Sequence, residues 1–319
     1  MKISVLIPTY NSAKLIRATL GSVLRQTRPP DEILVLDDGS TDGTISILNS
    51  YKPGVTVLQQ QNRGVAAARN ELCRRAGGDL IAFLDHDDIW HPGYLETQCK
   101  LHAMFPGAAA SFTGHVSFRG YNDYQWTEDP LAAETTAELI GAFRFLKSYH
   151  KDLGNFASMS FCCLPKSTLE SVGPNPFCEQ VSGVDDFYLC NLLPLIGPVA
   201  YLDKKVVAYR ITREAQSVNC LLGTKKALAA LNLVKDRYLG QRDTELTLLF
   251  TEVHAAKHRQ HARILFGAGQ RSCARKEVYL SFQHCRTFKS ICKSIGLLSA
   301  FRLPRALQPK WPPSIRGIR

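Results

Sequence analysis

The chain has 319 residues, of which 45% are hydrophobic and 21% are charged, a balance typical of folded globular proteins. This length suits one large α/β domain with an appendage, or two domains, and no apolar run reaches the roughly 18–20 residues of a membrane-spanning helix. The ten cysteines show neither a C-x-x-C pair nor a metal-ligand spacing, which indicates reduced thiols in a cytosolic protein.

The net charge of +11 is concentrated near the C-terminus. From residue 255 onward the chain has fourteen Lys and Arg residues and a single acid, Glu277. This asymmetry predicts an anionic partner for the C-terminal region, which is a membrane surface, a nucleic acid or an acidic polymer.

Strands and helices are predicted to alternate through the first hundred residues. Apolar runs predict strands at 3–8, 32–36, 55–58 and 80–84. Helical spacing and start signals predict helices that begin near residues 15, 42, 65 and 92. Short links between such elements are typical of βαβ units, so we expect a mostly parallel sheet with right-handed crossovers.

The second half of this predicted domain has less regular spacing. Strands are predicted at 108–118, 156–164, 201–202 and 206–210, and helices at 136–149, 165–173 and 183–193. The polar and aromatic segment between residues 120 and 134 is predicted to form a loop over the site. Its Trp126 and nearby tyrosines could stack on a sugar, and an ordinary packed loop is an equal alternative.

From about residue 221 the pattern is helical. Helices are predicted near 222–239, 243–266 and 271–284, followed by a basic amphipathic piece that includes Ile291 and Phe301. We therefore expect one α/β domain at residues 1–218, with halves 1–105 and 106–218, and a helical basic region at 219–319.

Carboxylates follow two of the predicted strands. Asp37 and Asp38 come after the second strand, and Asp85, Asp87 and Asp88 come after the fourth. Because the carboxyl ends of parallel strands meet at one edge of a sheet, both groups should face one crevice. Carboxylates this close repel each other, so the pattern predicts Mg²⁺ or Mn²⁺ holding a phosphate. A solvated acidic turn that caps the next helix is the alternative.

Four sequence segments occur in a characteristic order: Val5–Asn11, Val35–Asp42, Asn62–Asn70 and Phe83–Asp88. Together they resemble family 2 of the glycosyltransferases, the inverting enzymes with the GT-A fold. The resemblance covers residues 2 to about 105 densely and resumes at 166–173, 183–193 and 209–210. It implies a Rossmann-like, mostly parallel sheet flanked by helices, here with a helical basic C-terminal appendage.

The resemblance also implies a site for a nucleotide-diphosphate sugar. Asp38 would contact the base or ribose, Arg69 would lie near the base and pyrophosphate, and Asp87 and Asp88 would hold the divalent metal. In the place where the family often has a His, this chain has Arg213 as a candidate pyrophosphate contact. The implied substrate-binding residues are Pro8, Thr9, Tyr10, Asn11, Asp37, Asp38, Gly64, Arg69, Asp85, Asp87 and Arg213.

Asp186, or alternatively Asp185, is the candidate general base. The two residues occupy the place of the family's Glu-Asp motif, with Asp185 in place of the Glu. A carboxylate at a helix start is stabilised by the helix dipole, so its basicity would have to be raised by desolvation. An N-cap pair without catalytic function is the other reading.

The predicted activity is inverting transfer of a sugar, with UDP as the favoured nucleotide, to a hydroxyl of a glycan or lipid-linked acceptor in bacterial cell-envelope polysaccharide synthesis. A catalytically inactive GT-A protein with a binding or regulatory role is the alternative, and the complete set of acids argues against it. The expected location is cytoplasmic, with the basic tail at the inner face of the membrane. No nucleic-acid partner is expected, because the predicted crevice is acidic.

Overall fold

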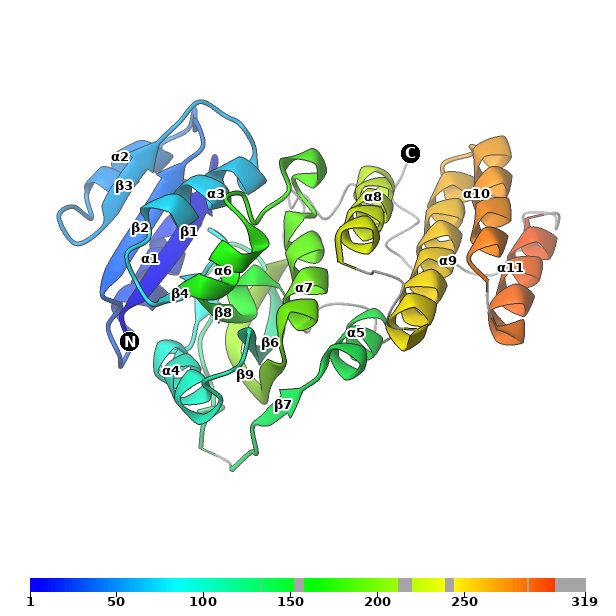
Figure 1. Cartoon of the computed structure of the whole chain (residues 1–319). Coiled ribbons are helices and arrows are strands. Elements are labelled where there is room, and N and C mark those ends of the chain that lie inside the picture. Colours follow the sequence, from blue (N-terminus) through cyan, green and yellow to red (C-terminus); the bar gives the residue numbers. More distant parts are fainter. Residues whose placement is uncertain (133, 152–157, 212–219, 239–243, 286, 302–319) are drawn as a thin grey trace. The chain divides into compact units, whose positions relative to one another are not determined.

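The computed structural model describes residues 1–132, 134–151, 158–211, 220–238, 244–285 and 287–301. The chain divides into two compact units, Met1–Arg213 and Glu214–Arg319. The first unit is an α/β fold and the second is helical (Figure 1). The predicted α/β class and the helical C-terminal region are therefore confirmed.

The N-terminal half of the sheet is parallel, as predicted. Its strands are β1 (Ile3–Thr9), β2 (Glu32–Asp37), β3 (Thr56–Gln59) and β4 (Leu80–Phe83), in the order β3-β2-β1-β4. The helices α1 (Ile16–Leu24), α2 (Thr44–Asn49) and α3 (Val65–Arg75) alternate with them. Every residue of β1 and β4 is buried, which is why β4 is entirely apolar and β1 is apolar except for Ser4 and Thr9.

The other half of the sheet is mixed. Here β4 pairs with β8 (Cys162–Pro165) and β8 with β6 (Ala110–Arg119) in antiparallel fashion, whereas β6 and β9 (Val199–Ile211) are parallel. The short strands β5 (Ile89–Trp90) and β7 (Glu138–Ile140) pair with β9 antiparallel and complete a nine-stranded sheet. The helices of this half are α4 (Tyr94–Met104), α5 (Ala142–Lys151), α6 (Lys166–Val172) and α7 (Asp185–Ile196).

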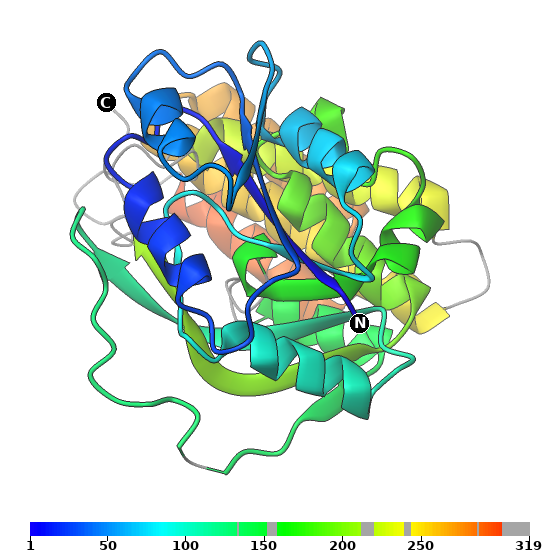
Figure 2. The same cartoon turned by 90° about the vertical axis from the view of Figure 1, so that its left-hand side faces the viewer.

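Three predicted boundaries in this half are wrong. The helix expected from residue 136 begins only at Ala142, because residues 138–140 join β9 as β7. The two strands expected near 201 and 206 are one curved strand, β9, which stays paired to β6 through two register shifts around Gly114, the partner of Lys205 (Figure 2). In the described part of 156–164, residues 159–161 form a 3₁₀ turn and the strand begins at Cys162.

The second unit contains α8 (Cys220–Tyr238), α9 (Thr244–Gly267), α10 (Arg271–Gln283) and α11 (Phe288–Ala300). It has its own hydrophobic core, in which the rings of Phe266 and Phe301 stack with centroids 4.2 Å apart. Among the described helices, none combines the length and apolar character needed to cross a bilayer. The predicted domain boundary after residue 218 lies in 212–219, outside the described residues, and stays a prediction.

Candidate active site

The carboxyl ends of β1, β2 and β4 meet at one edge of the sheet. Thr9 pairs in register with Asp37, and the amide of Asp38 donates to the carbonyl of Thr9 at 2.8 Å. The amide of Leu84 donates to the carbonyl of Leu6 at 3.0 Å, which places the acidic loop after β4 beside the loop after β1. The two acidic groups therefore share an edge of the sheet, as the alternation of strands and helices predicted.

The loop after β1 is shaped by hydrogen bonds to the loop after β2. Asn11 has a φ of 47°, in the left-handed region that Asn tolerates better than most residues. Its Oδ1 accepts from the amide of Thr41 at 2.8 Å, and its amide donates to Ser40 Oγ at 2.8 Å. Asp37 in turn accepts from the amide of Ser40 at 3.1 Å. The predicted nucleotide contacts of Pro8, Thr9, Tyr10 and Asn11 stay predictions.

Asp38 organises the loop that leads into α3. Its Oδ1 accepts from Gln60 Nε2 at 2.7 Å and from the amide of Arg63 at 2.9 Å, and its Oδ2 accepts from the amide of Gly64 at 2.8 Å. Gly64 has a φ of 87°, and a Cβ there would lie 2.8 Å from Ser182 Oγ, so only glycine fits. A carboxylate has about four acceptor positions, so little of Asp38 is left for the predicted base or ribose contact.

Arg69 on α3 joins two segments that are far apart in the sequence. Its side chain is buried, with Nη1 2.7 Å from Asp185 Oδ2 and Nη2 2.5 Å from Asp85 Oδ1. Burial alone would lower the pKa of Arg69, but Asp85, Asp185 and Asp186 together raise it, so the guanidinium stays charged. Its pyrophosphate contact stays a prediction, and here both terminal nitrogens bind carboxylates.

Asp87 and Asp88 have the character of cation ligands. Asp88 is fully buried, its Oδ1 accepts from the amide of Arg210 at 2.9 Å, and its Oδ2 has no hydrogen-bond partner among the described residues. Burial raises the pKa of both carboxyls, and repulsion from Asp85 adds to this effect. A divalent cation would relieve both the burial and the repulsion.

A divalent cation held by Asp87 and Asp88 would take its other ligands from water and from the phosphates of the substrate. Within the described part of the chain, no three His, Cys, Asp or Glu side chains are grouped to hold a metal. Mg²⁺ and Mn²⁺ prefer oxygen ligands, and Mg²⁺ usually keeps waters and substrate phosphates in its shell. Asp87 and Asp88 together with a diphosphate therefore fit such an ion.

Arg210 on β9 is a site residue whose role the sequence analysis missed. It is almost fully buried, and its Nε donates to the carbonyl of Asp87 at 2.7 Å. Its Nη1 donates to the carbonyls of Gly120 at 2.6 Å and Asn122 at 2.9 Å. Its guanidinium lies over the ring of Phe118 at 4.4 Å. The signal in the sequence was a charged residue that directly follows an apolar strand, whereas the cation role was assigned to Arg213, which lies outside the described residues.

The two candidate bases at the start of α7 differ sharply. Asp185 is fully buried, accepts from the amide of Gly183 at 2.9 Å and pairs with Arg69. Asp186 is half-buried, and burial raises its pKa to about 6, with Asp185 and Asp85 adding to the rise and Arg69 opposing it. A carboxyl with this pKa can accept a proton near neutral pH, whereas Asp185 is committed to its ion pair.

Tyr209 lies near the acids of both halves of the fold. Burial raises the pKa of its phenol, and Asp88, Asp87, Asp85 and Asp186 raise it further. The side chain of Tyr209 therefore lies within electrostatic reach of the acidic loop after β4 and of the start of α7.

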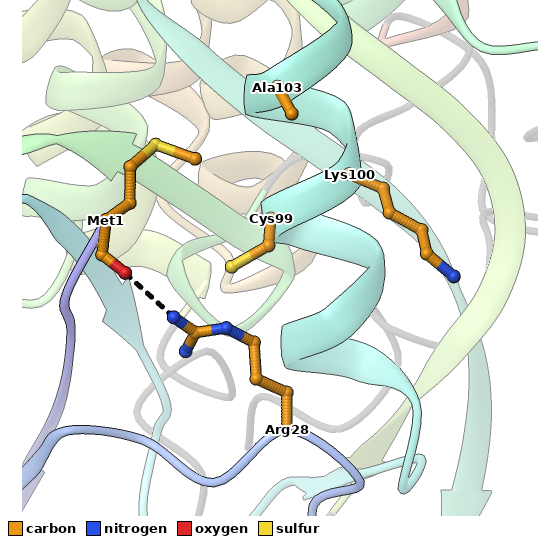
Figure 3. Close-up of a pocket in the computed structure, with 5 residues that line it drawn as sticks. All are labelled: Met1, Arg28, Cys99, Lys100 and Ala103. Atoms are coloured by element: carbon orange, nitrogen blue, oxygen red, sulfur yellow. Dashed lines mark hydrogen bonds between the residues drawn. The ribbon is translucent and has the colours of Figure 1, made fainter.

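A hollow of about 260 Å³ lies at the other end of the strands. It is lined by Met1, Arg28, Cys99, Lys100 and Ala103, and Arg28 Nη2 donates to the carbonyl of Met1 at 2.7 Å (Figure 3). Met1 precedes β1, whereas the carboxylates follow the ends of β2 and β4. This hollow is therefore not part of the candidate site.

Comparison with known sequences identifies a match to one family. Residues 4–166 match the profile described as "Glycosyl transferase family 2". TuaG of Bacillus subtilis, a glycosyltransferase provisionally assigned to teichuronic acid biosynthesis, is 42% identical over 117 residues, which cover 35% of this chain and 46% of that protein. The Escherichia coli β-1,3-glucosyltransferase WfgD, which is named for UDP-Glc and α-D-GlcNAc-diphosphoundecaprenol, is 40% identical over 31% of this chain and 40% of its own length. The chain thus spans less than half the length of these curated relatives.

Solved structures resemble nearly the whole chain. Residues 1–349 of Staphylococcus aureus TarS in complex with UDP-GlcNAc match with a TM-score of 0.66 and 18% identity, over 94% of this chain and 90% of that one. The mannosyltransferase PcManGT of Pyrobaculum calidifontis, in complex with GDP-Man and Mn²⁺, matches with a TM-score of 0.58 and 18% identity. The match covers 94% of this chain and 80% of that one. At this identity the likeness concerns the fold alone.

Proposed function

The chain belongs to glycosyl transferase family 2, and we propose that it transfers a sugar from a nucleotide diphosphate to an acceptor hydroxyl, with inversion at the anomeric carbon. The GT-A fold implied by the sequence is confirmed by the structural likeness. The proposed donor is a UDP-sugar, as in the TarS complex and in the name of WfgD. The proposed acceptor is a glycan or lipid-linked saccharide of a bacterial cell envelope, which the names of TuaG and WfgD support.

The arrangement at the start of α7 carries this proposal. Arg69 holds Asp185 and Asp85 together, and Asp186 beside them has a pKa raised to about 6. Asp186 can therefore remove the proton of an acceptor hydroxyl as the hydroxyl oxygen attacks the anomeric carbon. Attack from the side opposite the diphosphate breaks the bond to the leaving group and inverts that carbon.

Asp87 and Asp88 would hold the divalent cation. Bound there, Mg²⁺ or Mn²⁺ would neutralise charge on the departing diphosphate. Arg210 would hold these acids in position, because its backbone amide donates to the Asp88 carboxylate and its Nε donates to the carbonyl of Asp87. The acidic loop is thereby held in place before a donor arrives, which lowers the reorganisation needed for reaction.

The first test separates donor binding from catalysis. The full chain is titrated calorimetrically with UDP, GDP and dTDP, each with Mn²⁺ and with EDTA, and release of the nucleotide from the matching sugar donor is then followed. We expect one nucleotide to bind in a metal-dependent way and Asp87→Ala to abolish that binding.

Asp186→Asn should keep donor binding nearly unchanged and lose almost all transfer, because the amide cannot accept the proton. Glu170→Gln, an exposed change on α6, is the control and should keep full activity. Wild-type turnover of Asp186→Asn would move the base elsewhere. Absence of nucleotide binding to the folded wild-type protein would refute the enzyme function.

We also propose that the second unit contacts the inner face of the membrane, close to a lipid-linked acceptor. On α11 the exposed Ile291 and Ile295 lie one turn apart, with the exposed Lys289 and Lys293 on the same helix. Apolar side chains flanked by cations suit the interface of an anionic bilayer.

A further inference from the structure

A second hollow, of about 340 Å³, lies beside β6 and β9. Val116 of β6 lines it, whereas the preceding residue His115 stacks on Phe161 at 4.5 Å and lies 5.9 Å from the ring of Tyr209. Successive side chains of a strand point to opposite faces of the sheet. Because Tyr209 faces the active-site carboxylates, the hollow lies on the other face of this part of the sheet.

Two half-buried aromatic rings form one wall of the hollow. Tyr124 and Trp126 come from the loop after β6 and meet edge to face, with centroids 4.9 Å apart and planes at 76°. The indole of Trp126 also meets the ring of His91 edge to face at 5.0 Å. Tyr124 and Trp126 also pack against Ala18, Ile89 and Ala208, so the predicted cover of the site is wrong for these two residues and stays a prediction for the rest of the loop.

Apart from Val116 and Pro130, the remaining lining is polar, and its formal charges cancel. Glu128 and Asp203 supply two carboxylates, and Lys204 and Lys205 supply two ammonium groups. A phosphate or nucleotide would favour a net positive lining, so this lining suits a neutral ligand with many hydroxyl groups. The apolar C–H face of a sugar ring packs on aromatic rings while its hydroxyls bond to charged groups.

The size of the hollow limits the ligand. Sites for small molecules occupy about 300–1,000 Å³, and this hollow lies near the lower end of that range. It is therefore suited to one sugar unit, or to a sugar and part of its neighbour.

Contacts connect the aromatic wall to the acidic loop of the active site. The ring of Tyr124 lies 5.1 Å from that of Phe118, over which the guanidinium of Arg210 is placed at 4.4 Å. Arg210 binds the carbonyls of Asn122 and Asp87. The loop that carries the aromatic residues is thus tied to the acidic loop, although neither Asp87 nor Asp88 lines the hollow.

We propose that this hollow binds a neutral sugar unit of the acceptor glycan, as a second binding site separate from the acidic site. The assignment of the sugar to the acceptor rests on the proposed glycosyltransferase function. The binding itself depends only on the residues around the hollow and can be measured without catalysis.

The test titrates the full chain with two neutral disaccharides, cellobiose and chitobiose, and follows saturation transfer to the sugar protons by NMR. The wild-type protein should bind at least one of them, with the strongest transfer to the C–H protons of a ring. Trp126→Ala should weaken binding by roughly tenfold, because the stacking face is lost. Lys205→Ala should also weaken binding, and since Lys205 is exposed this variant is expected to fold normally.

Two matched variants complete the experiment. Tyr279→Ala removes an exposed aromatic ring of the second unit, and Asp186→Asn alters the crevice, so both should bind the disaccharides like the wild type. Binding of UDP with Mn²⁺ should be unchanged in Trp126→Ala. Equal sugar binding by wild type, Trp126→Ala and Lys205→Ala would overturn the proposal, as would no binding of either disaccharide. Binding through Trp126 by a wild-type protein that binds no nucleotide would instead refute the enzyme function and leave the second site standing.

Discussion

Arg69 shows how one buried side chain can set the roles of its neighbours. Its two terminal nitrogens hold Asp85 and Asp185 at 2.5 and 2.7 Å, and both partners are largely shielded from water. Asp185 is thereby held in an ion pair at the start of α7. The adjacent Asp186 has no such guanidinium bond among the described residues, and burial raises its pKa. Two neighbouring aspartates thus receive different chemistry from their surroundings.

Arg69→Met should destabilise the protein by about 3–5 kcal/mol, because it leaves buried carboxylates without their cation. Arg74→Met on the same helix is the control, since Arg74 pairs with Glu71 in an exposed position and should cost only about 0–1 kcal/mol. Denaturant unfolding measures both variants. In Arg69→Met, a further Asp185→Asn change should restore part of the lost stability. A loss of stability in Arg69→Met as small as that in Arg74→Met would show that the buried ion pairs contribute little to stability.

The raised pKa of Asp186 predicts an acid limit to activity. As pH falls through about 6 the carboxyl takes up a proton and can no longer act as a base, so kcat should fall by roughly tenfold per pH unit below that point. The measurement uses saturating donor and metal, with donor binding and circular dichroism followed at each pH. The residual activity of Asp186→Asn should not show this decrease in kcat at low pH. A kcat that stays constant between pH 7 and about 4.5 would exclude Asp186 as the base.

Among the helices, α11 differs in what it exposes. Ser290, Ser294 and Leu297 face the interior of the second unit, whereas Ile291 and Ile295 are exposed. Two β-branched apolar residues one turn apart in water, beside lysines, form a short amphipathic stripe. Such a stripe is favoured at a membrane interface, where the apolar side chains leave water and the lysines meet anionic headgroups.

Ile291→Ser with Ile295→Ser should weaken binding to phosphatidylglycerol vesicles by at least roughly tenfold, because two apolar side chains no longer enter the interface. Vesicle sedimentation measures the bound fraction. The matched control is Leu222→Ser with Leu248→Ser, which removes two equally exposed leucines from α8 and α9 and should have little effect. If the two double variants lost vesicle binding equally, or if neither lost any, a specific role of α11 would be contradicted.

On the scale of the whole molecule, charge and chemistry are separated along the chain. The first unit contains the acidic site, whereas the fourteen Lys and Arg residues from 255 onward belong to the second. We therefore relate the net charge of +11 to the proposed membrane contact of the second unit rather than to catalysis. Binding to an anionic surface by dispersed surface charges is screened by salt.

Vesicle binding should accordingly fall steeply as NaCl rises from about 50 to about 500 mM, because the Debye length shortens over this range. The comparison uses phosphatidylglycerol vesicles and neutral phosphatidylcholine vesicles, and the neutral ones should bind weakly at every salt concentration. Binding that is insensitive to salt, or equal for the two lipids, would show that the basic region is only a solvated surface.

The local sequence pattern was sufficient for the four parallel strands and the helices of the first hundred residues. Uninterrupted apolar runs such as 80–83 are buried on both faces, and each is followed by polar residues, so strand, loop and edge could be predicted together. The two- and three-residue strands β5 and β7 were missed because segments so short carry no periodic signal. Their pairing depends on β9, which is more than fifty residues away in the chain.

The sequence by itself determined the fold class, the acids and the edge of the sheet where they gather, because these follow from hydrophobic period and strand order. Only the tertiary structure decided which acid is paired and which is left to titrate, since Arg69 and Asp185 are 116 residues apart. It also decided that Arg210 holds Asp87 and Asp88, and that Trp126 lines a separate hollow. Burial, pKa and pairing depend on the side chains that surround a residue in space, and no local pattern of residues specifies those.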